Sequence, residues 1–113
     1  MVERIQPTTS KEKAEIFEII MPLLKALYEE FRELSKKKPD AKINETKINI
    51  SNRLLEKSRI VLANESTIDY LILLEKDLIP SNDDVVIIMS QYMTAMNKFK
   101  KDYFNYEANR WRT

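Results

Sequence analysis

The fold is decided by residues 85–106, which read VVIIMSQYMTAMNKFKKDYFNY. Apolar residues recur through this stretch in alternating steps of four and three, at Val85, Met89, Tyr92, Met96, Phe99, Tyr103 and Tyr106. That period places them on one face of a helix, whose length is roughly 30 Å at about 1.5 Å per residue. Just before it, Ser81 and Asp84 have the spacing of a capping box, in which each side chain bonds the other's backbone N–H. The stretch therefore predicts a long helix with one continuous apolar face.

Upstream, a similar apolar stripe predicts a first long helix. It steps by three or four residues through Ile16, Ile20, Leu23, Leu27, Phe31 and Leu34. Thr9 and Glu12 have capping-box spacing at its start, and Pro39 is expected to end it. Pro22 lies inside the stripe, where a proline removes one helical hydrogen bond at a cost of about 3 kcal/mol. We therefore expect the first helix to be kinked or broken near Pro22.

Two further helices are predicted between these long ones. One covers about residues 45–63, where Ile48, Leu55 and Leu62 lie seven apart. The other is shorter, begins at Ser66 with Asp69 as a cap-like pair, and ends before Pro80. Residues 68–74 and 85–89 are rich in branched side chains, as strands are, but neither segment alternates polar with apolar residues. Because the chain also lacks the glycine that hairpin turns favour, we predict helix for both.

The predicted fold class is all-α, a compact antiparallel bundle of about four helices. The whole chain, residues 1–113, is expected to form a single helical domain, because no linker or low-complexity tract divides it. Residues 1–8 are expected to form an extended arm and residues 107–113 a C-terminal tail.

The composition excludes most catalytic chemistry. Glycine, cysteine and histidine are all absent, so the chain has no phosphate-binding glycine loop, thiolate nucleophile or imidazole base. Carboxylates such as Asp69, Glu75 and Asp77 are interpreted as capping or solvated residues. We therefore predict no enzyme activity, no catalytic residues, no metal site and no cofactor.

The charge balance and apolar runs limit the partners. Nineteen lysines and arginines face eighteen acidic residues, a net charge of +1, which is typical neither of a nucleic-acid coat nor of a DNA mimic. Every apolar run is too short to cross a bilayer, and the N-terminus lacks the apolar region of a signal peptide. The expected location is the cytoplasm, without membrane binding.

The C-terminal segment is the best candidate for a binding surface. From residue 85 onward, five basic residues exceed two acidic ones, and aromatic residues are interleaved with them. Tryptophan, tyrosine and arginine are enriched at interface hot spots, and aromatic side chains among basic ones also stack on nucleobases. Trp111 either packs back over one end of the bundle or anchors a partner. The predicted contact residues are Lys98, Lys101, Tyr106, Arg110, Trp111 and Arg112.

These observations favour a small non-catalytic protein–protein interaction module, acting as an adaptor, regulator or inhibitor of an unidentified protein partner. The alternative is a nucleic-acid-associated protein that binds through the same basic and aromatic segment. A homodimer through the last helix is a further possibility, because Met89, Tyr92 and Met96 suit an interface as well as a core.

Overall fold

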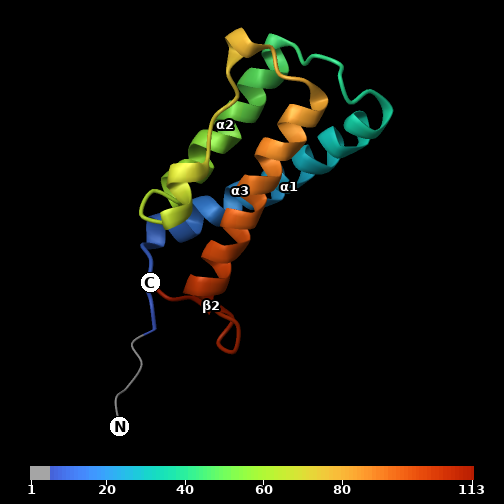
Figure 1. Ribbon diagram of the computed structural model, residues 1–113. Coiled ribbons are helices and arrows are strands. Elements are labelled where there is room, and N and C mark those ends of the chain that lie inside the picture. The colour runs from blue at the N-terminus through green and yellow to red at the C-terminus, as the bar shows by residue number, and fades with distance from the viewer. Residues whose placement is uncertain (1–5) are drawn as a thin grey trace.

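The computed structural model describes residues 6–113, in which three α-helices pack together and a short strand pair follows the last (Figure 1). The elements are α1 (Lys11–Lys37), α2 (Glu45–Val61), the 3-10 turns η1 (Ser66–Tyr70) and η2 (Lys76–Leu78), α3 (Asn82–Tyr103), β1 (Phe104–Asn105) and β2 (Arg110–Trp111). Most of the expected N-terminal arm, residues 1–5, lies outside the described part. Residues 6–8 have no regular secondary structure.

Side-chain caps fix the helix starts. The predicted capping box of α3 is confirmed, because Ser81 Oγ accepts from the Asp84 N–H at 3.2 Å and Asp84 Oδ2 accepts from the Ser81 N–H at 2.9 Å. For α1 the predicted cap is displaced by one residue, since Ser10, rather than Thr9, caps the helix. Asn44 caps α2 in the same way. Each such cap contributes about 1 kcal/mol.

The first helix continues through Pro22. It runs without interruption from Lys11 to Lys37, so of the two arrangements expected near Pro22, a kink or a break, the break is wrong. Buried residues on both sides of the proline, including Ile20 and Leu24, pack into one core. Because breaking the helix would remove one side from that core, packing offsets the hydrogen bond that Pro22 cannot make.

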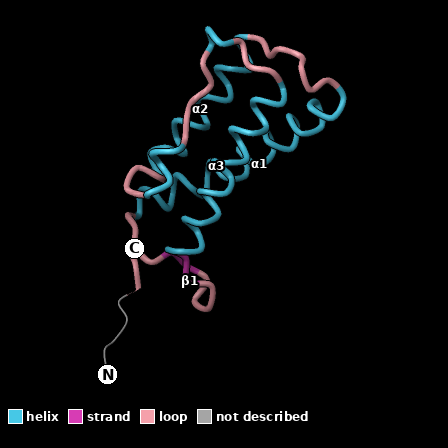
Figure 2. The backbone as a smooth tube through the Cα atoms, viewed as in Figure 1, coloured by secondary structure: helices cyan, strands magenta, loops and turns pink. Residues whose placement is uncertain are grey.

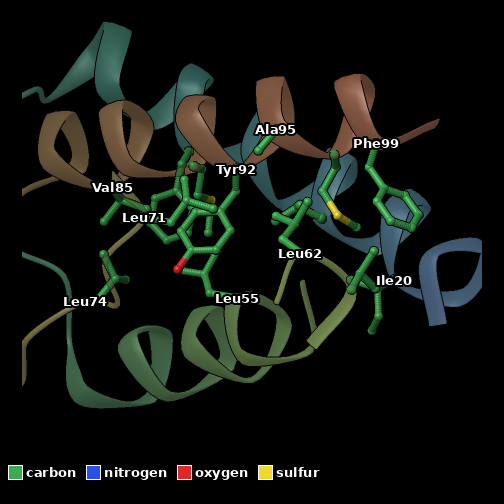
Figure 3. Close-up of a cluster of buried hydrophobic side chains, with 14 of the residues drawn as sticks. Ile20, Leu55, Leu62, Leu71, Leu74, Val85, Tyr92, Ala95 and Phe99 are labelled. Atoms are coloured by element: carbon green, nitrogen blue, oxygen red, sulfur yellow. The ribbon is translucent and has the colours of Figure 1, made fainter. Parts of the chain in front are cut away.

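The predicted fourth helix is the main error in the expected fold. Between the two 3-10 turns, residues 71–75 are extended (Figure 2). Three bundle helices are therefore present in residues 6–113, and an extended segment takes the place of the fourth. Figure 3 shows Leu71 and Leu74 among side chains of α2 and α3, with Leu55 on one side and Val85 on the other.

Residues 71–75 lack the backbone hydrogen bonds of a helix. Side chains of α2 and α3 supply hydrogen bonds to their backbone groups instead. The Asn52 side chain from α2 donates to the Leu74 carbonyl and accepts from the Leu74 N–H, both at 2.9 Å. From the same helix, Arg59 donates to the Leu71 carbonyl at 2.6 Å. The Tyr92 hydroxyl of α3 donates to the Ile72 carbonyl at 2.9 Å. Because buried backbone groups need such partners, these contacts hold the segment extended.

The regular apolar face of α3 lies in the core, as the central rod of the bundle. Met89, Tyr92 and Met96 are all fully buried within one chain, so this face offers no seam to a second copy. The last helical residue is Tyr103 rather than Tyr106. Tyr106 lies beyond the helix with an exposed fraction of 64%, and the continuation of the stripe to that residue is therefore wrong.

Two small polar residues of α2 lie on its buried face. Ser51 and Ser58 are fully buried, and Ser58 Oγ donates to the Leu54 carbonyl one turn earlier at 2.9 Å.

Replacing Asn52 with alanine should destabilise the fold by about 2 kcal/mol, because two hydrogen bonds to Leu74 are lost at about 1 kcal/mol each. Urea unfolding followed by circular dichroism measures this change. Asn49→Ala is the matched control, because Asn49 is exposed on the same helix and its substitution changes only helix propensity. Equal stabilities for the two variants would contradict a structural role for Asn52.

Candidate functional site

The C-terminal residues form a small hairpin where a tail was predicted. Phe104 pairs with Trp111 and Asn105 with Arg110 in antiparallel register. The turn succeeds without glycine because Asn109 has a φ of 54°, in the left-handed region that asparagine tolerates better than most residues. Beyond the hairpin, the Arg112 N–H donates to the Tyr103 carbonyl at 2.8 Å.

Trp111 packs back over the end of the bundle. Its ring contacts Phe17 of α1 at 5.0 Å and Phe99 of α3 at 5.7 Å between centroids. The indole N–H donates to Glu18 Oε1 at 2.8 Å. These contacts join the two ends of the chain, and they correspond to the first of the two arrangements expected for this tryptophan.

Two of the other predicted contact residues are engaged within the chain. The Arg112 guanidinium donates to the Asp102 carbonyl at 3.0 Å. Lys98 forms an ion pair with the Asp102 carboxylate at 2.6 Å, which raises the pKa of Lys98. Exposed ion pairs of this kind contribute less than about 1 kcal/mol.

The remaining three, Lys101, Tyr106 and Arg110, are exposed. Lys101 and Tyr106 line a shallow hollow together with Arg112, whereas Arg110 and Trp111 line another hollow beside the start of α1. Five of the six predicted residues are therefore divided between two shallow surfaces, Lys98 lines neither of them, and the role of all six in binding stays a prediction.

Replacing Trp111 with alanine should destabilise the fold by about 2 kcal/mol, less than the cost at a fully buried aromatic site because the ring is only half-buried. Tyr106→Ala, at an exposed aromatic of the same hairpin, should cost less than about 1 kcal/mol. Thermal unfolding of the two variants measures the difference. If Trp111→Ala were as stable as Tyr106→Ala, the packing described above would not contribute to folding.

A second candidate surface was not predicted from the sequence. We call it the loop patch, and it consists of Ile72, Leu78, Ile79 and Ile87. Their exposed fractions are 57%, 73%, 54% and 60%, respectively. Ile72, Leu78 and Ile87 line one hollow of about 290 Å³. Single exposed apolar residues are ordinary, but several gathered around one hollow are typical of an interaction site.

The backbone of the loop patch is strained at Ile79. This residue has φ 46° and ψ 72° in the left-handed region, which a β-branched side chain rarely adopts and which costs roughly 1–2 kcal/mol. Strained backbone of this kind is concentrated at functional sites. Ile79 therefore adds a second, independent feature to a surface already marked by exposed apolar side chains.

The charges around the loop patch are negative. Residues 65–84 contain six acidic residues and one lysine. Two of the acids, Glu75 and Asp84, line the hollow, whereas Glu65 lies at the other end of the segment and accepts from the Tyr103 hydroxyl. That lysine, Lys76, pairs with Glu45 at 2.5 Å, whereas Glu75 and Asp77 make no ion pair within residues 6–113. The backbone N–H of Ser81 bonds the Asp84 carboxylate and lowers its pKa, so the hydrogen bond favours its charged form. The surface is therefore apolar with an acidic surround.

One sequence signal could have indicated the loop patch. Residues 71–74 are four consecutive apolar residues, and Leu78 and Ile79 follow one turn later. Consecutive residues of a helix are about 100° apart, so a surface helix could not bury all of these side chains at once. The pattern therefore already favoured a segment with some apolar residues facing solvent.

No cluster of three acidic side chains able to hold a metal ion occurs in the part of the chain that the structure describes. Among residues 6–113, none of the helices combines the length and apolar character that crossing a membrane requires. Comparison of the chain with protein-family models, curated proteins and solved structures gave no match.

Replacing Ile79 with asparagine should stabilise the protein by about 1 kcal/mol, because asparagine adopts the left-handed region at lower cost. The same change at Ile72, where the backbone needs no positive φ, should give no gain. Chemical unfolding of both variants tests this contrast. A loss of stability in Ile79→Asn similar to that in Ile72→Asn would show that the backbone of Ile79 is not strained.

Proposed function

We propose that this protein is a small non-catalytic interaction module that binds a partner protein through the loop patch. The observation that carries the proposal is the hollow lined by Ile72, Leu78 and Ile87, three large aliphatic side chains that are each more than half exposed. Leaving such side chains in water forgoes roughly 1.5–3 kcal/mol of burial each. A partner that covered them would recover much of that free energy.

The surroundings of the loop patch indicate the chemistry of the partner. Glu75 and Asp84 line the hollow, and Asp77 is next to Leu78 in the chain. An apolar centre with an acidic rim is complementary to an apolar segment flanked by lysine or arginine. The same charges repel phosphate, so this surface favours a protein over a nucleic acid.

The packed part of the chain supports the patch as a rigid platform. Ile72 lies next to Leu71, which is 6% exposed, and its own carbonyl is bonded by Tyr92. Ile87 projects from α3, whose opposite face forms the core. Because these residues are already held in place, a partner would order little of this surface on binding, which favours affinity.

The test is affinity capture from cells that make the protein, comparing the wild type with the double variant Ile72→Ser and Leu78→Ser. The control is Ile60→Ser, because Ile60 is an exposed aliphatic residue of α2, 44% exposed, that lines neither the hollow of the loop patch nor those of the C-terminal hairpin. Circular dichroism and thermal unfolding establish that all three proteins are folded. Each capture is divided into a nuclease-treated and an untreated half.

We expect the wild type and Ile60→Ser to retain the same protein partner after nuclease treatment, and the double variant to lose at least nine-tenths of it, a change of about 1.4 kcal/mol. A partner retained equally by the double variant would contradict binding through the loop patch. A partner set lost on nuclease treatment would instead favour nucleic-acid association, through the exposed Lys101 and Arg110 of the hairpin end.

A further inference from the structure

The face formed by α1 and α2 carries a groove separate from the loop patch. Its volume is about 480 Å³. Ile20, Leu27 and Leu54 lie along it as buried or half-buried residues, and Leu23 and Ile50 are about half exposed, at 52% and 48%. Like the loop patch, this groove presents aliphatic side chains that a single copy of the chain leaves partly in water.

The two walls of the groove have opposite charges. Glu30 of α1 is on one wall, and Arg53 and Lys57 of α2 are on the other. All three residues are exposed, and none of them forms an ion pair with another of the residues described, 6–113. A surface with one acidic and one basic wall can complement itself, because a rotated copy presents the opposite wall to each side.

We infer that the α1–α2 groove is the contact surface of a homodimer with a two-fold axis along the groove. Such an axis places α1 of one copy over α2 of the other at the same level of the groove, so that Leu23 packs on the partner's α2 towards one end and Ile50 packs on the partner's α1 towards the other. The short connection of residues 38–44 joins the end of α1 to the start of α2. Glu30, late in α1, therefore lies towards the same end of the groove as Arg53 and faces the partner's Arg53.

This arrangement completes the four-helix packing that one chain lacks on this face. The two copies contribute two helices each, and the aliphatic residues between them are covered from both sides. From Ile20 to Glu30 the groove is only about 15 Å long at about 1.5 Å per residue. Such a short interface is expected to lie at the small end of the range for specific complexes, so the association is best sought at micromolar concentrations.

The dimer does not use the apolar stripe of α3, which is buried in the core, and it does not use the loop patch. It is therefore compatible with partner binding at the loop patch. The inference goes beyond the proposed function, and either one can fail without the other.

The experiment is sedimentation equilibrium of the wild type across the micromolar range, together with variants of the groove. Leu23→Asp places a carboxylate among the aliphatic side chains that the dimer buries and should leave only monomer at these concentrations. Glu30→Arg and Arg53→Glu each put two like charges opposite one another where Glu30 faced the partner's Arg53. The two-fold axis repeats this repulsion, so it occurs twice in the dimer. Each should weaken the association by about tenfold, and the combined charge reversal should restore it.

Two controls separate the groove from other surfaces. Glu29→Arg makes the same charge change at an exposed position of α1 outside the groove and should dimerise like the wild type. The double variant Ile72→Ser and Leu78→Ser should also dimerise normally. A wild type that stays monomeric, or a dimer insensitive to Leu23→Asp and to the charge reversals, would overturn the inference, as would a dimer lost only in the loop-patch variant.

Discussion

The pair of hydrogen bonds between the Asn52 side chain and the backbone of Leu74 is the constraint on which the rest of the structure depends. One carboxamide satisfies both the N–H and the carbonyl of a residue 22 positions later in the chain. It acts as a neighbouring strand would, but from the surface of a helix. With Leu74 held there, Leu71 and Leu74 fill the space between α2 and α3, and Ile72 is directed outward. The core and the exposed loop patch therefore arise from the same contact.

Tyr92 shows how apolar packing and polar satisfaction are combined in this core. Its ring is fully buried at the centre of the apolar face of α3, and its hydroxyl donates to the Ile72 carbonyl. Burial raises the pKa of this hydroxyl, which favours the protonated form that donates this hydrogen bond. A buried tyrosine without such an acceptor would lose the free energy that its hydroxyl gains from water. The extended segment supplies that acceptor.

The sequence predicted the elements that local signals determine. Pro39 and Ser81 place the end of α1 and the start of α3 correctly, because stop and cap signals act within a single turn. The extended course of residues 71–75 depends instead on Asn52 and Tyr92, which are distant in the chain, so no local pattern reveals it. The hairpin was missed because Asn109 adopts the conformation expected of glycine. Trp111 was recognised as unusual, but only its contact with Phe17 shows where it packs. The loop patch was not predicted, because Ile72, Leu78 and Ile79 fall within the short helix that the sequence pattern predicts between Ser66 and Pro80.

The most direct test of this account is native-state hydrogen exchange of the Leu74 amide. The Leu74 amide lies outside any helix but is bonded to Asn52. It should therefore exchange as slowly as core amides of α3, such as that of Met89. In Asn52→Ala, the protection of the Leu74 amide against exchange should fall more than that of any other amide. The helical amides of α1 should keep the same ranking of exchange rates as in the wild type. Exchange of Leu74 in the wild type as fast as that of the exposed turn residue Asp77 would contradict the account. In that case the extended segment would not be part of the cooperative core.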